Sequence, residues 1–147
     1  MPIPDLNDDG YLPEGVYECS IDELESRFGK FQSCDIRVKL FNSLKNYIDE
    51  LKSADVGKFL IIDGSFTTIK ERPSDIDLLL ILKDDVDLEK PVPPFKYNVR
   101  SKKYLKKYYP FDFYFGFEGD DSSNKMLDWF FRVKYSTLKK GFLKILL

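Results

Sequence analysis

Two short apolar runs with a polar segment between them dominate the hydrophobic pattern of the chain. The first run, residues 59–62, ends at Asp63, Gly64 and Ser65, and the second spans Ile76 to Leu82. Apolar runs of four to eight residues that are bounded by turn residues are typical of buried β-strands. We therefore expect two strands, the first of which ends in a tight turn.

Apolar residues at three- and four-residue steps predict a long helix from about Cys34 to Ser53 that packs on the sheet. Its apolar face is formed by Ile36, Leu40, Leu44, Tyr47, Ile48 and Leu51. Basic residues between these positions are expected on a solvated face, namely Arg37, Lys39, Lys45 and Lys52.

Two shorter helices are also expected. Ser20 and Glu23 have the spacing of a capping box, which predicts a helix from Ile21 to Phe28 that stops at Gly29. After a polar loop over residues 119–124, a helical pattern covers residues 125–135. Its inward-facing residues are expected to be Met126, Trp129, Phe130 and Val133.

A strict alternation predicts a third strand from Phe111 to Phe117, with four phenylalanines on one face and Asp112 and Tyr114 on the other. Residues 141–147 alternate more weakly, which predicts either a last strand at the sheet edge or a segment that lies against another subunit. These elements together predict an α/β (α+β) fold, a small mixed sheet with helices packed mainly on one face.

Length and charge limit the classes of protein to consider. The 147 residues predict a single domain over residues 1–147, in which residues 1–19, rich in Pro, Asp and Gly, form an arm without a regular element. A net charge of −2 gives no overall attraction to nucleic acid or to anionic membranes. No apolar stretch reaches the roughly 18 residues of a membrane span, and no basic-then-apolar leader begins the chain. We expect a cytoplasmic protein with no membrane partner.

The side-chain inventory excludes several kinds of catalytic site. The chain has no His, and its two cysteines, Cys19 and Cys34, have no metal-ligand spacing. Zinc sites built on His, Ser-His or Cys-His nucleophile pairs and imidazole bases are therefore excluded, and both cysteines are expected to be reduced, structural thiols. Carboxylates and a metal ion remain as the plausible catalytic groups.

Asp75 and Asp77 stand at the entrance of the second expected strand. Residues i and i+2 of a strand lie on one face, so the two carboxylates would stand side by side and could share a divalent cation such as Mg²⁺ or Mn²⁺. Upstream, Gly64 allows close approach of the backbone to a phosphate, and Ser65 can donate a hydrogen bond to it.

Gly64-Ser65, a nine-residue spacer and Asp75-Ile76-Asp77 resemble the signature of the nucleotidyltransferase (polymerase beta-like) superfamily. The chain is also similar to a family of small bacterial nucleotidyltransferase-like proteins. That second resemblance covers most of the chain and rests on residues 7–15 (NDDGYLPEG), 20–23, 27–29, 64–66, 75–77 and 140–142.

The resemblance implies a role for each site residue. Gly64 and Ser65 would hold the β- and γ-phosphates of a nucleoside triphosphate, and Asp75 and Asp77 would bind Mg²⁺ or Mn²⁺. Asp112 would be the third carboxylate, acting as a metal ligand and as the base toward an acceptor hydroxyl. Two residues in the spacer, Lys70 and Arg72, are candidates to neutralise the triphosphate.

The resemblance also implies that a nucleoside monophosphate moves to an RNA (such as tRNA) or to a partner protein, in a toxin–antitoxin or phage-defence system. Residues 96–109 interleave basic and tyrosine side chains, which suits either contact with RNA or a solvated helix with tyrosines turned inward.

Simpler interpretations stay open. Gly64 can serve a plain hairpin turn, and Asp75, Asp77 and Asp112 can be solvated strand residues. Lys70 and Arg72 can belong to a solvated loop. A non-catalytic nucleotide- or partner-binding protein that retains the fold is the alternative to an enzyme.

Overall fold

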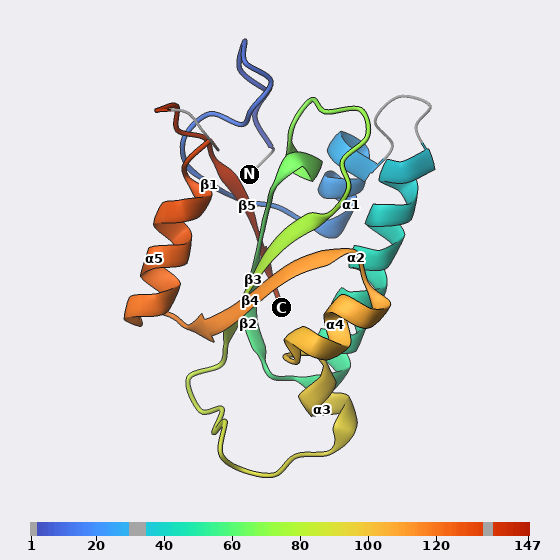
Figure 1. Ribbon diagram of the computed structural model, residues 1–147, viewed down its shortest axis with the longest axis vertical. Helices are drawn as coiled ribbons and strands as arrows, with labels where there is room; N and C mark the ends of the chain where they lie inside the picture. Colours follow the sequence, from blue (N-terminus) through green and yellow to red (C-terminus); the bar gives the residue numbers. More distant parts are fainter. Residues whose placement is uncertain (1–2, 30–34, 134–136) are drawn as a thin grey trace.

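The computed structural model describes residues 3–29, 35–133 and 137–147, which form one five-stranded mixed sheet with helices on both faces (Figure 1). The strand order is β1-β5-β2-β3-β4. The strands are β1 (Val16–Glu18), β2 (Gly57–Asp63), β3 (Ile76–Leu82), β4 (Phe111–Phe117) and β5 (Phe142–Leu146). The helices are α1 (Ile21–Leu24), the π-helical turn η1 (Glu25–Gly29), α2 (Asp35–Ala54), the 3-10 turn η2 (Ser65–Thr67), α3 (Pro94–Asn98), α4 (Lys102–Tyr108) and α5 (Asp121–Phe130). No helix in this part of the chain is both long enough and apolar enough to cross a membrane.

Strands β2, β3 and β4 carry the residues that the sequence singled out. β2 runs antiparallel to β3, and β3 runs parallel to β4. The parallel pair needs a crossover connection, which is supplied by the loop after β3 together with α3 and α4. β3 and β4 have the bounds that the apolar pattern predicts, and the mixed α/β architecture is confirmed.

The two faces of the sheet have separate apolar cores. The larger core lies under α2 and takes the even-numbered residues of β3, such as Leu78 and Leu80, with buried residues from α1 and α4. The smaller core joins Leu79 and Ile81 to Phe130 of α5. Of the described helices, α5 lies on one side of the sheet and the others on the opposite side, so the helices pack mainly on one face, as predicted (Figure 1).

The C-terminal strand differs from the prediction. β5 is not at the sheet edge, because it lies between β2 and β1 and pairs with both. Its parallel partner β1 comes from the N-terminal arm, which was expected to contain no regular element. The pairing is short and joins the two ends of the chain, with Val16 opposite Phe142 and Glu18 opposite Lys144. The strand within residues 141–147 thus pairs with strands of this chain on both sides.

The last helix begins earlier than its pattern predicts. Asp120 caps α5, because its Oδ1 accepts a hydrogen bond from the backbone N–H of Ser123 at 2.6 Å. Residues 121–124 of the segment expected to be a polar loop are therefore the first turn of the helix. Trp129 was expected to face inward but is 62% exposed, whereas its neighbour Phe130 is buried.

Two predictions touch residues outside the described ranges. Cys34, at the predicted start of the long helix, and residues 134–135, at the predicted end of the last helix, both lie there. Cys19 is a buried free thiol, as expected for a structural cysteine. Burial is the main cause that raises the pKa of the Cys19 thiol to about 12, which keeps it protonated at neutral pH.

Candidate functional site

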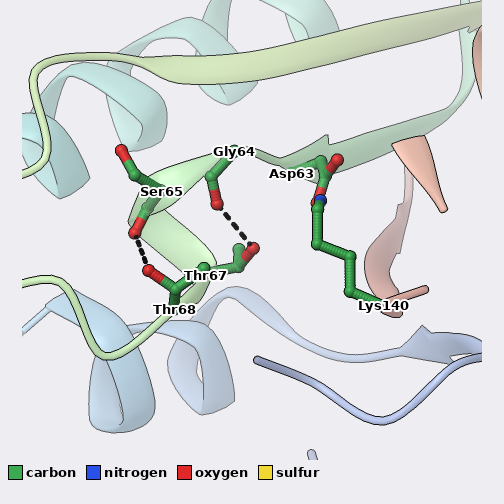
Figure 2. A network of polar contacts seen from close by, with 6 residues as sticks. All are labelled: Asp63, Gly64, Ser65, Thr67, Thr68 and Lys140. Carbon is green, nitrogen blue, oxygen red and sulfur yellow. Dashed lines mark hydrogen bonds and ion pairs between the residues drawn. The ribbon is translucent and has the colours of Figure 1, made fainter. Parts of the chain in front are cut away.

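The turn after β2 is built by its own hydrogen bonds. Gly64 has a φ of +89°, and a Cβ at this position would lie 3.0 Å from the carboxylate carbon of Asp77, so the turn requires glycine. The hydroxyl of Thr67 donates to the carbonyl of Gly64 at 3.2 Å, and that of Thr68 donates to the carbonyl of Ser65 at 2.7 Å (Figure 2). The Ser65 hydroxyl points away from these bonds (Figure 2).

Arg37 of α2 holds the segment that follows this turn. Its guanidinium donates to the carbonyls of Phe66 at 2.6 Å, Thr68 at 2.7 Å and Lys70 at 2.5 Å, and also to that of Phe28 at 3.2 Å. The prediction of a solvated Arg37 is wrong, since the residue is fully buried. The carbonyls of Phe66, Thr68 and Lys70 turn toward α2, and a planar guanidinium with five donors can satisfy all three at once.

Four aspartates gather on the α5 face of the sheet, at the end where β2 finishes and β3 begins. Asp77 pairs laterally with Asp63 of β2 on one side and with Asp112 of β4 on the other. Asp75 precedes β3 by one residue and has the same parity as Asp77. Lateral partners in a sheet point to the same face, so these carboxylates share one surface.

The crowding changes the protonation of this surface. Desolvation is the largest cause that raises the pKa of Asp77 to about 7, and repulsion from Asp75, Asp63 and Asp112 adds to it. The pKa of Asp75 is also raised, by desolvation first and by Asp112 second. A surface with these properties favours any ligand that brings positive charge.

A buried ion pair closes one side of the aspartate group. The Lys140 ammonium contacts Oδ1 of Asp63, and both side chains are almost fully buried (Figure 2). Burial raises the pKa of Asp63 to about 6, against the opposing effect of Lys140. The backbone fixes Lys140, because its N–H donates to the carbonyl of Phe131 at 2.7 Å and the next N–H, of Gly141, donates to that of Leu12 at 2.9 Å.

Sequence reasoning did not assign Asp63 and Lys140 to the site. One signal was present for each: Asp63 immediately precedes the Gly64-Ser65 pair, and Lys140 is among the residues that carry the family resemblance. Neither signal reveals that the two side chains meet, because 77 positions separate them in sequence.

A cleft of about 790 Å³ opens beside these residues. Four parts of the chain line it: the end of β2 with the turn and spacer that follow, the start of β3, the N-terminal arm, and the end of α5 with the segment beyond it. Its lining residues are Asp9, Gly10, Tyr11, Asp63, Gly64, Ser65, Thr68, Ile69, Lys70, Asp77, Trp129, Arg132, Val133 and Lys140. The cleft has the size of sites that take small ligands.

The cleft brings together some of the predicted site residues but not all. Gly64, Ser65, Lys70 and Asp77 line it. Asp112 lies beside Asp77 on the same sheet face but is exposed outside the cleft wall, and Asp75 is half-buried at the start of β3. Arg72 is exposed in the spacer and does not line the cleft.

Carboxylate oxygens are the ligands that Mg²⁺ and Mn²⁺ prefer, and a divalent cation would relieve the repulsion that raises the pKa of Asp77. The donor chemistry therefore fits such an ion. As the side chains lie, however, no three His, Cys, Asp or Glu residues within the described ranges are close enough together to hold one.

The basic and aromatic segment, residues 96–109, forms the end of α3, the turn that follows and α4. Its lysines Lys102, Lys103, Lys106 and Lys107 are exposed. Two of its tyrosines are turned toward the protein, since the hydroxyls of Tyr104 and Tyr109 donate to the carboxylate of Glu50, at 3.4 and 2.9 Å. Lys102 lies against the Tyr114 ring, with its ammonium 4.5 Å from the ring centroid. Tyr104 and Tyr109 thus have structural partners, while Tyr97, Tyr108 and the four lysines are exposed and accessible to a ligand.

Comparison with known proteins identifies a family but not an activity. A family model described as a family of unknown function, DUF6932, matches residues 4–146. Neither the comparison with curated proteins nor the comparison with solved structures found a significant match. The matched segment covers both cores, the cleft and the aspartate group. The chain therefore belongs to the DUF6932 family.

Proposed function

We propose that this protein is a metal-dependent nucleotidyltransferase, which moves a nucleoside monophosphate from a nucleoside triphosphate to a hydroxyl of an RNA or a protein. The supporting observation is the lateral register of Asp63, Asp77 and Asp112 on one sheet face, directly beside the Gly64 turn. Carboxylates that repel one another can bind a divalent cation, and the solvent-accessible backbone turn beside them can receive phosphates. Together these groups suit a nucleoside triphosphate with its metal ion.

Each residue would have a defined task. The turn at Gly64 and Ser65 would receive the β- and γ-phosphates, and Lys70, on the same cleft wall, would neutralise part of their charge. Asp75 and Asp77 would hold Mg²⁺ or Mn²⁺, with Asp112 as a third ligand. The ion, when bound, supplies charge neutralisation and alignment of the phosphates.

In the proposed reaction the acceptor oxygen attacks the α-phosphorus, and the bond from that phosphorus to the β-phosphate oxygen breaks. Pyrophosphate leaves, and the acceptor proton passes to the carboxylate of Asp112. The exposure of Asp112 at the edge strand β4 leaves room for a macromolecular acceptor. The lysines of α4, the helix that directly precedes β4, would contact the phosphates of an RNA acceptor. Nucleoside triphosphates and Mg²⁺ are available in the cytoplasm, where this activity would operate.

Transfer of label tests the proposal. Protein, Mg²⁺ and each α-³²P-labelled nucleoside triphosphate are incubated with total RNA or with cell lysate, because the reaction retains the α-phosphate in the product. Label should move to RNA or to protein with the wild type and with Asp85→Asn, an exposed aspartate at the other end of β3. Asp77→Asn should abolish transfer. Equal transfer by the two variants would overturn the assignment of the site.

A binding protein without catalysis is the second candidate. One observation favours it: the described residues contain no ready set of three metal-binding side chains. This candidate predicts that nucleoside triphosphate still binds in the cleft while no label reaches any acceptor. Loss of binding in Asp77→Asn, together with absent transfer by the wild type, would support it over the enzyme.

A further inference from the structure

Trp129 stands out among the apolar side chains because it is large and exposed. It is the only tryptophan in the chain, and 62% of its surface is accessible. The helix that carries it is anchored through the next residue, Phe130, which is buried and packs on Phe142 with the ring centroids 6.2 Å apart. The core therefore fixes the backbone at Trp129 while the indole ring remains on the surface.

The indole lies on the wall of the same cleft as the Gly64 turn. Backbone contacts connect the two walls. The N–H of Arg132 donates to the carbonyl of Trp129 at 3.0 Å. The carbonyl of Phe131 accepts a hydrogen bond from the backbone N–H of Lys140. The ammonium of Lys140 in turn contacts Asp63, the residue before Gly64. Trp129 is therefore held in a fixed relation to the turn at which phosphates would bind.

Arg132 adds charge to this wall. It lines the cleft one turn beyond Trp129 and is exposed, and no ion pair of its side chain occurs among the described residues. A flat aromatic surface, an exposed cation and the Gly64 turn line one cleft. Such a combination suits a ligand that carries both a base and phosphates. The cleft volume of about 790 Å³ is sufficient for a whole nucleotide.

We propose that Trp129 is the stacking platform for the base of a nucleotide whose phosphates lie at Gly64 and Ser65. This inference rests on the proposed function, because it assigns the base subsite of the same cleft. Stacking uses the π-face that every base possesses, so the subsite accepts purine and pyrimidine nucleotides and selects against ligands that lack a base. Arg132, which is exposed and lines the same cleft, would add a cationic contact to the nucleotide.

Because Trp129 is the only tryptophan in the chain, its fluorescence reports directly on this subsite. Intrinsic fluorescence of the wild type should change when a nucleoside triphosphate is added with Mg²⁺, and should not change with inorganic tripolyphosphate, which carries the phosphates without a base. Binding of both ligands is measured in parallel by calorimetry, which does not depend on the indole.

Trp129→Ala should bind nucleoside triphosphate about ten- to one-hundred-fold more weakly, in line with the loss of one base–aromatic stack. Its affinity for tripolyphosphate should equal that of the wild type. Trp129→Phe keeps an aromatic face and should retain most of the nucleotide affinity. A fall in the affinity for both ligands would mean that the substitution disturbs the cleft as a whole, and would overturn the base assignment.

The outcomes separate this inference from the proposed function. Equal nucleotide affinity of wild type and Trp129→Ala, with label transfer intact, overturns the base subsite and leaves the transferase. Trp129-dependent binding without transfer to any acceptor overturns the transferase and leaves the base subsite. If the wild type binds neither ligand, both are overturned.

Discussion

The two faces of the sheet differ in how completely they are covered. On the face under α2, the residues of β3 from Ile76 to Leu82 that point inward are all buried and apolar. On the face under α5, the same strand begins with Asp77 and becomes apolar only at Leu79 and Ile81. The apolar part of this second face is the part that packs against α5. Asp75, Asp77 and Asp112 lie beyond this apolar part and are half-buried or exposed, and Asp63 is buried there against Lys140.

This difference separates the residues that specify the fold from those that form the site. Burial of a side chain such as Leu80 contributes about 1.5–3 kcal/mol to folding. Asp77 instead opposes folding at neutral pH, because its raised pKa means that the native protein disfavours its charged form. A group that lowers stability and lines a cleft is a candidate for function rather than for scaffold.

The largest loss of stability is expected on replacement of Arg37, which connects α2 to the segment that follows the Gly64 turn. Arg37→Ala would leave the buried carbonyls of Phe28, Phe66 and Thr68 without their donor. We expect a loss of about 3–5 kcal/mol in the free energy of unfolding, since each unsatisfied group costs about 1–3 kcal/mol. Denaturant unfolding measures it. Lys39→Ala, on the exposed side of α2, is the matched control and should change stability by less than about 0.5 kcal/mol.

A cavity on the sheet face under α2 should lower the free energy of unfolding by somewhat less than the loss of Arg37. Leu80→Ala removes a fully buried side chain from the larger core and should lower the free energy of unfolding by about 3 kcal/mol. Because the change lies away from the cleft, ligand binding by the folded fraction should be unchanged. If Leu80→Ala unfolded no more readily than Lys39→Ala, the proposed division between scaffold face and site face would be wrong.

Replacement of Asp77, on the sheet face under α5, should have a smaller effect on stability and one of opposite sign. The pKa of Asp77 is about 7 in the native protein and 3.8 in its reference state, so the native form binds the extra proton between these values. Its contribution to stability is therefore greatest near pH 4 and is lost as the pH rises through 7. Asp77→Asn should be more stable than the wild type at pH 8, by about 1 kcal/mol after allowance for solvent screening, and equal to it near pH 4. Thermal unfolding across this range measures the difference, and a variant less stable than the wild type at pH 8 would contradict the account.

Local patterns in the sequence were sufficient for much of the fold. The apolar run of β3 and the phenylalanine alternation of β4 depend on neighbouring residues alone, and both strands have the predicted bounds. The capping box at Ser20 is also confirmed. The prediction placed β5 at the sheet edge, because its neighbour β1 has only three residues and comes from the N-terminal arm. No local sequence pattern in either segment indicates that they pair.

The polar groups around the site were harder to predict, because each depends on a distant partner. Arg37 lies among solvated basic residues in the helical pattern, but its acceptors at Lys70 lie 33 positions away. Trp129 and Phe130 were both assigned to the core by their places in the helical pattern, but only Phe130 is buried. Side-chain type and periodicity do not reveal which of two adjacent aromatic residues the fold will bury.

The most direct test of the central claim is a comparison of thermal stability with and without ligand. With Mg²⁺ present, a nucleoside triphosphate at about one hundred times its dissociation constant should stabilise the wild type by about 2.7 kcal/mol, because it binds only the native state. Asp85→Asn should respond as the wild type does, and Asp77→Asn should lose the response. An equal rise in melting temperature for all three proteins would contradict the claim that the aspartate group beside the Gly64 turn binds the nucleotide.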